Sequence, residues 1–162
     1  GCVNVNGFQL EKIRSRAIPY LRRTLGVIFQ DFRLIENKTV YDNVAFAMRV
    51  IGASEKEIKK RVPYVLELVG LENKGRRLPN ELSGGEQQRV AIARGLTMDR
   101  RLLLADEPTG NLDSENSDNI IDLLLKLAHD ENRCVIVVTH DLSVMDRADV
   151  VYRINDGLLE RR

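Results

Sequence analysis

The chain has 162 residues, of which 43% are hydrophobic and 30% are charged, a composition typical of a single globular domain. Its 25 Lys and Arg residues against 24 Asp and Glu residues leave a net charge of +1, which excludes the strongly basic surface of a general nucleic-acid or membrane-surface binder. No apolar run exceeds five residues, whereas a bilayer-spanning helix needs about 20.

Three short apolar runs predict strands, and longer amphipathic segments between them predict helices. The runs are Leu25–Phe29, Leu102–Ala105 and Cys134–Val138. Each is apolar on both faces, as expected of parallel strands covered by helices on both sides. We therefore expect the α/β fold class with a mostly parallel sheet, and expect Cys134 to be a small core residue.

Helix signals occupy the chain between the first two predicted strands. Apolar residues from Tyr41 to Met48 recur at helical spacing and end before Gly52. Ser54 and Glu57 form a capping box for the next helix, in which Pro63 predicts a kink or a division into two short helices. The segment from about residue 38 to 80 contains no predicted strand, which suggests a helical subdomain.

Two further signals come late in the chain. Apolar residues from Ile120 to Ala128 recur at helical spacing, and Asp113 precedes that helix as its N-cap. At the end, the segment Asn155-Asp156-Gly157 separates two apolar stretches and predicts the turn of a β-hairpin.

A phosphate-binding helix terminus is predicted at Ser83-Gly84-Gly85-Glu86. Ser83 is an N-cap, and Glu86 completes a capping box three residues later. The two glycines leave the first backbone N–H groups uncovered, so this terminus suits an anion such as a phosphate. The alternative is a capped surface helix that binds nothing.

Polar side chains follow each predicted strand, at the sheet edge where ligands bind in such folds. Asp106 and Glu107 suit a Mg²⁺ ligand and a general base, although they could be two solvated carboxylates. His140 could contact a γ-phosphate, or could be a turn histidine satisfied by Asp141. Gln30 could bind a metal or a water, or could be an ordinary loop residue.

In this order, these elements resemble the ATP-binding cassette (ABC) ATPases. Residues 82–88 match the family signature, 102–107 the Walker B strand with its catalytic glutamate, and 111–113 the D-loop. Gln30 matches the Q-loop glutamine and His140 the switch histidine. The resemblance extends over the whole chain.

The resemblance implies the fold, cofactors and site. It implies a P-loop NTPase-type ABC ATPase core formed by residues 1–37 and 98–162, with a helical subdomain, including the signature helix, at about 38–97. It implies ATP and Mg²⁺ as cofactors and a head-to-tail homodimer as the working unit. The implied catalytic residues are Glu107 and His140; the implied nucleotide-binding residues are Gln30, Ser83, Gly84, Gly85, Glu86, Asp106 and Asp113, of which Gln30 and Asp106 would also bind the metal.

Within the family, residues 26–34, 39–45 and 50–54 look most like the FtsE subfamily of cell-division ATPases. This implies an integral membrane partner similar to an FtsX-type permease, no nucleic acid, and a cytoplasmic location on the inner face of the plasma membrane. Residues 141–152 look more like the ATPases of lipoprotein release and of macrolide or peptide export, which stay as an alternative. A non-catalytic interaction fragment is a second alternative. A DNA-repair cassette protein is disfavoured by the near-neutral charge.

The chain departs from the family in one respect. The phosphate-binding loop G-x-x-x-x-G-K-[ST], the Walker A segment, does not occur in it. We therefore expect an N-terminally truncated domain that by itself neither binds ATP well nor hydrolyses it. Loss of a strand and a helix from the core would also expose apolar surface.

Overall fold

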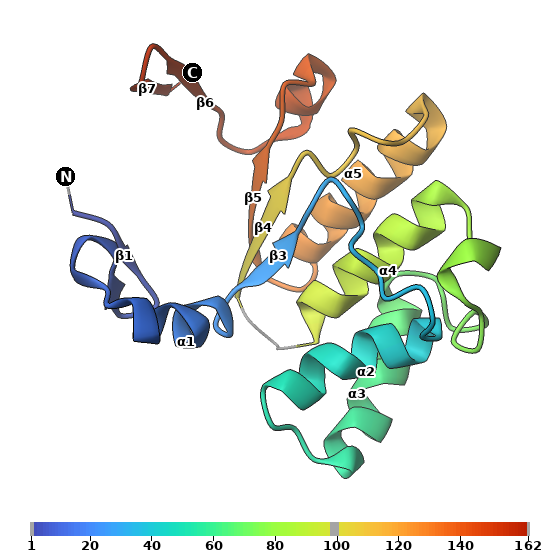
Figure 1. Ribbon diagram of the computed structural model, residues 1–162. Helices are drawn as coiled ribbons and strands as arrows, with labels where there is room; N and C mark the ends of the chain where they lie inside the picture. The colour runs from blue at the N-terminus through green and yellow to red at the C-terminus, as the bar shows by residue number, and fades with distance from the viewer. Residues whose placement is uncertain (1, 98–100, 162) are drawn as a thin grey trace.

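The computed structural model describes residues 2–97 and 101–161 (Figure 1). At its centre is a parallel sheet of three strands, β3 (Gly26–Ile28), β4 (Leu102–Asp106) and β5 (Cys134–Val138), in the order β3-β4-β5. All three correspond to predicted strands, and the predicted α/β class is confirmed. Because β4 is in the middle, its carboxyl end lies between those of the other two strands.

Four helices form the body on one side of this sheet. They are α2 (Val40–Val50), α3 (Glu55–Leu68), α4 (Gly84–Leu96) and α5 (Ser114–His129). Each begins after an N-cap whose side-chain oxygen accepts from a backbone N–H of the first turn: Thr39, Ser54, Ser83 and Asp113. Helices α4 and α5 contact the sheet, and α2 and α3 pack on α4 (Figure 1). Shorter helical segments are α1 (Ile18–Arg22) and the 3₁₀ turns Leu10–Lys12, Ser15–Ala17, Pro79–Glu81 and Leu142–Arg147.

Two β-hairpins project from the body (Figure 1). One joins β1 (Asn4–Val5) to β2 (Phe8–Gln9), and the other joins β6 (Tyr152–Asn155) to β7 (Leu158–Arg161). In the second, Asp156 and Gly157 both have positive φ, at 48° and 81°, as a tight two-residue hairpin turn requires. The predicted C-terminal hairpin is confirmed.

The sheet is covered on one face only among the described residues. Pairing places Val27, Leu104 and Ile136 on the same face, opposite to the one that α4 and α5 cover. Ile136 on that open face is 47% exposed. The prediction that helices cover both faces is therefore wrong, and so is the prediction that Cys134 is buried. Cys134 lies two residues before Ile136, so it points to the same open face.

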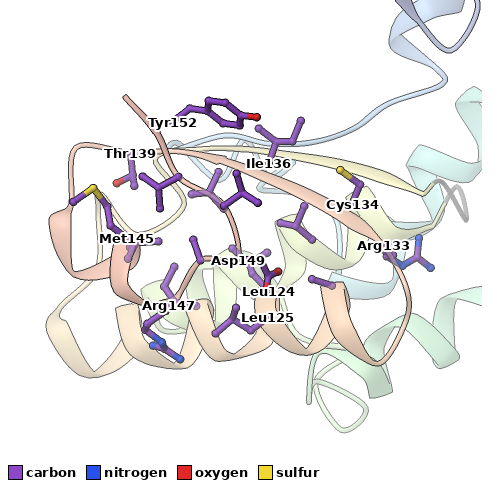
Figure 2. A pocket seen from close by; sticks show the side chains of 18 residues that line it. Leu124, Leu125, Arg133, Cys134, Ile136, Thr139, Met145, Arg147, Asp149 and Tyr152 are labelled. Carbon is purple, nitrogen blue, oxygen red and sulfur yellow. The ribbon is translucent and has the colours of Figure 1, made fainter. Parts of the chain in front are cut away.

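A cavity of about 560 Å³ lies along the outer edge of β5, the edge that pairs with no other strand in the described part of the chain (Figure 2). Its lining is mostly apolar, with Leu124 and Leu125 of α5 on one side and Tyr152 on another. Apolar side chains are therefore exposed along this edge and on the open face.

Helix α3 continues through Pro63 as a single element. The predicted division into two short helices is wrong. Proline removes one backbone hydrogen bond, but Pro63 itself is exposed, whereas Val62 and Val65 on either side of it are buried. Burial of these neighbours keeps the helix continuous across Pro63. No helix in the described residues is both long and apolar enough to cross a membrane.

The close approach of β3 to α4 allows no side chain at Gly26. An added methyl group would lie 2.7 Å from the carbonyl oxygen of Gly95 and 2.9 Å from Leu103 Cδ1. We expect Gly26→Ala to lower the free energy of unfolding by about 1–3 kcal/mol, because the clash involves backbone. Urea unfolding of the full-length protein measures this. Gly75→Ala is the matched control, since its nearest contact would be 3.7 Å; equal losses in the two variants would contradict the packing argument.

Candidate functional site

Polar residues from two neighbouring strands meet at the carboxyl edge of the sheet. The β4–β5 register pairs Asp106 with Val138, so the residues that follow each strand emerge side by side. The chain then turns sharply at Glu107, whose φ is +46° and whose N–H donates to the Val138 carbonyl at 2.8 Å. This turn places the Glu107 side chain next to the residues that follow β5.

The Glu107 carboxylate accepts three hydrogen bonds from the residues after β5. Its Oε1 lies 2.8 Å from His140 Nδ1 and 3.1 Å from the His140 backbone nitrogen, and its Oε2 accepts from Thr139 Oγ1 at 3.0 Å. The alternative of a turn histidine satisfied by Asp141 is wrong, because Asp141 instead accepts from the backbone and hydroxyl of Ser143. The structure thus brings together the two residues predicted to be catalytic.

These hydrogen bonds shift the pKa values of both Glu107 and His140. The hydrogen bond from His140 lowers the pKa of the Glu107 carboxyl group, and the same hydrogen bond raises the pKa of His140. Glu107 is consequently an ionised acceptor at neutral pH. A carboxylate has about four acceptor positions. After three hydrogen bonds, Glu107 can still accept one from a water molecule.

We expect the pKa of His140 to be above the usual range for imidazole, and to fall toward that range in Glu107→Gln. NMR titration of the imidazole signals measures it, with His140→Gln used to assign the resonance. Because the pKa is raised in the folded state, the stabilisation from this pair is complete below the unfolded-state pKa and is lost as the pH rises through the folded-state pKa. A His140 titration that Glu107→Gln leaves unchanged would contradict the pairing.

Two oxygen-bearing side chains next to this pair fit a hard cation. Asp106 is exposed, and its carboxylate forms no hydrogen bond or ion pair with the described residues, so it is available. Gln30 lies against Gly110, where an added methyl group would be 2.8 Å from its Nε2. No group of three or more His, Cys, Asp and Glu residues is placed to hold a metal in residues 2–97 and 101–161. Mg²⁺ is usually bound by one or two carboxylates together with phosphate and water.

The predicted capping box at the start of α4 is present. Ser83 Oγ accepts from the Glu86 N–H at 3.3 Å, and Glu86 Oε2 accepts from the Ser83 N–H at 3.0 Å. The hydrogen bond from Ser83 lowers the pKa of Glu86, with Lys74 as a secondary cause. Packing also favours glycine at position 85, because an added methyl group there would overlap the Asn116 side chain.

Asp113 joins this region to α5. As the N-cap of that helix it accepts from the Asn116 N–H at 2.8 Å, and its two oxygens also accept from the Asn116 amide. Nearby, Asn111 Nδ2 donates to the Gln30 carbonyl at 3.1 Å. Residues 111–113 therefore contact both the loop after β3 and the start of α5.

Within one chain the predicted residues form two groups. Gln30, Glu107 and His140 lie at the sheet edge with the loop residues Gly110 and Asn111. The start of α4 instead lies against Leu112 and Asn116, and against Phe32 of the loop after β3.

The sequence interpretation missed three polar residues that hold the segments after β3 and β4. Gln88 Nε2 donates to the Pro108 carbonyl at 2.7 Å. Arg94 donates to the backbone carbonyls of Phe32 and Arg33. The Asn43 side chain forms hydrogen bonds with backbone groups of Ile35, Lys38 and Thr39. Gln88 and Asn43 are fully buried. A polar residue at helical spacing among apolar ones, as in Val40–Asn43–Val44, was the available signal.

Comparison with known proteins gives consistent matches. A sequence model of the ABC transporter family matches residues 1–110. The chain is 49% identical over 146 residues to the cell division ATP-binding protein FtsE of Streptococcus pneumoniae serotype 2, covering 90% of the chain and 63% of that protein. It is 43% identical over 162 residues to FtsE of Bacillus subtilis, covering 99% and 71%.

A solved structure agrees with the sequence matches. It is a dimeric post-hydrolysis state of the ATP-binding cassette MJ0796, bound to ADP and Pi. It is 34% identical to the chain and superposes with a TM-score of 0.81, covering 99% of the chain and 73% of that protein. The chain thus spans between about 63% and 73% of the length of these relatives.

Proposed function

Since the chain belongs to the ABC transporter family, we propose that the full-length protein is the ATP-binding and ATP-hydrolysing subunit of an FtsE-like complex that acts in cell division. The observation that carries this proposal is the Glu107–His140 pair, 2.8 Å apart, next to Asp106 at the carboxyl edge of the sheet. A base, a cation ligand and a hydrogen-bonding imidazole at one edge suit phosphoryl transfer to water.

In this proposal Glu107 is the general base. A water molecule that donates to its free acceptor position attacks the γ-phosphorus of ATP, the bond to the ADP oxygen breaks, and the water's proton passes to Glu107. Asp106 and Gln30 would hold Mg²⁺, which when bound neutralises charge on the phosphates. His140, 84% exposed, both orients Glu107 and presents its outer ring nitrogen toward the γ-phosphate.

We propose that the working unit is a head-to-tail homodimer. The start of α4, with Ser83, Gly84, Gly85 and Glu86, would bind the nucleotide held by the second subunit, and Asp113 would lie at the same junction. Two observations support this. The start of α4 does not share contacts with the Glu107–His140 pair in the described residues, and the similar cassette MJ0796 forms a dimer.

The partner would be an integral membrane protein similar to an FtsX-type permease, which would place the subunit at the cytoplasmic face of the plasma membrane. On this account residues 38–97, with α2, α3 and α4, act as the helical subdomain. Phe46 and Val50, one turn apart on α2, are 48% and 45% exposed and provide an apolar docking surface. An ATPase of lipoprotein release or of macrolide or peptide export is the alternative, and the FtsE relatives favour cell division.

The test is phosphate release from ATP by the full-length protein, meaning the product of the complete gene, compared with the 162-residue chain. We expect turnover that depends on a divalent cation and is abolished by EDTA. Full-length protein that binds its membrane partner without releasing phosphate would favour the non-catalytic alternative. The 162-residue chain alone is expected to show no turnover.

A further inference from the structure

A buried glutamine connects helix α4 to the turn that carries Glu107. Gln88 has no exposed surface, and its Nε2 donates to the Pro108 carbonyl at 2.7 Å. The acceptor is a carbonyl, so only the NH₂ side of the amide can face it, and the orientation of the Gln88 side chain is determined. Pro108 is also buried, so Gln88 satisfies a carbonyl that water cannot reach.

The turn that receives this hydrogen bond has an unfavourable backbone conformation. Glu107 has φ of +46°, a region that residues other than glycine rarely adopt. Three hydrogen bonds hold the turn: from the Glu107 N–H to Val138, from the Gly110 N–H to Glu107, and from Gln88 to Pro108. The first two lie within the sheet edge and the turn itself. The third comes from the helix whose first residues are Gly84 and Gly85.

Gln88 differs from the other glutamine of this helix because it is fully buried and only one of its two polar side-chain atoms is hydrogen-bonded. Its Oε1 is buried and has no hydrogen-bond partner among the described residues. A residue kept only for packing would be better replaced by an apolar side chain of the same size, which leaves no unpaired acceptor. The neighbouring Gln87 is half-buried and donates to Leu82 in its own segment, so it makes no such connection.

We propose that Gln88 is a positioning residue that couples the start of α4 to the Glu107 turn. A displacement of α4 moves Pro108 through this hydrogen bond, and with it the adjacent Glu107. The functional meaning rests on the proposed head-to-tail dimer. In that dimer, the start of α4 binds the nucleotide held by the second subunit, whereas Glu107 acts on the nucleotide held by its own subunit. Gln88 therefore links the two nucleotide sites.

The test compares Gln88→Met with Gln87→Met in the full-length protein, first without nucleotide. Methionine keeps the length of the side chain and removes the donor. We expect amide hydrogen exchange in residues 107–112 to rise roughly tenfold in Gln88→Met, with residues 40–68 unchanged. With ATP, we expect kcat to fall about 10- to 100-fold with KM unchanged, as for loss of an outer-shell partner. Gln87→Met is expected to leave the exchange at residues 107–112 unchanged, because Gln87 donates to Leu82 and not to the turn.

Unchanged exchange at residues 107–112 in Gln88→Met would overturn the proposal, as would an equal rise throughout the protein, which indicates a role in overall stability only. If Gln88→Met does not fold, Gln88→Asn, which shortens the donor by one methylene group, is judged by the same criteria. Exchange is measured without nucleotide. If the wild-type protein lacks turnover but Gln88→Met shows the local rise in exchange, the proposed function is contradicted and the coupling is still supported.

Discussion

Glu107→Gln in the full-length protein is expected to lower ATP turnover by about 10²- to 10⁴-fold, the usual contribution of a general base. The amide has nearly the same shape as the carboxylate, and its single oxygen can still accept from the His140 backbone while its NH₂ group faces the Thr139 hydroxyl. It cannot take a proton from water. Steady-state phosphate release measures the loss.

The same variant is expected to bind ATP as the wild type does, because the proposed nucleotide contacts are made by other residues. Glu115→Gln, on the first turn of α5, is the matched control, since it removes a carboxylate away from the sheet edge. Turnover of Glu107→Gln within tenfold of the wild type, with binding unchanged, would contradict the assignment of Glu107 as the base.

Ser83→Asp is expected to lower turnover by about 10²- to 10³-fold, the loss typical when one preorganised donor to a developing negative charge is disabled. Asp is as good an N-cap as Ser, so α4 should keep its start. The added carboxylate, however, would repel a phosphate at the bare N–H groups of Gly84 and Gly85.

Ser83→Asn is the control that distinguishes the effect of the added negative charge from the effect of the larger side chain. Asn has the size of Asp and also caps helices well, but it is neutral. We expect Ser83→Asn to keep most of the turnover and Ser83→Asp to lose it, with both variants melting near the wild-type temperature. Equal turnover in the two variants would mean that no anion binds at this helix terminus.

Much of the fold could be predicted because its signals are local. The capping boxes at Ser54 and Ser83 each lie within four residues, and both helices begin where predicted. The exposure of Cys134 could not be predicted, because an apolar run does not show which face of its strand a distant helix covers. The continuity of α3 through Pro63 could not be predicted for a similar reason. The burial of Val62 and Val65 of α3 against neighbouring helices outweighs the loss of one backbone hydrogen bond.

The sequence predicted which residues form the candidate site better than it predicted the contacts between them. Asp106, Glu107 and His140 follow predicted strands, so a common edge could be expected. The choice of Glu107 over Asp141 as the partner of His140 depends on the register between β4 and β5, which joins residues 33 apart in sequence. Gln88 was missed for the same reason, because its acceptor Pro108 is 20 residues away on another element.

The central claim is that each ATP site combines the Glu107 edge of one subunit with the Ser83 helix of the other. It is tested most directly by mixing Ser83→Asp and Glu107→Gln subunits of the full-length protein, each inactive as a homodimer. A mixed dimer would contain one site with both residues intact, so an equal mixture should regain about a quarter of wild-type phosphate release if the sites act independently. A mixture as inactive as its two components would contradict the shared site.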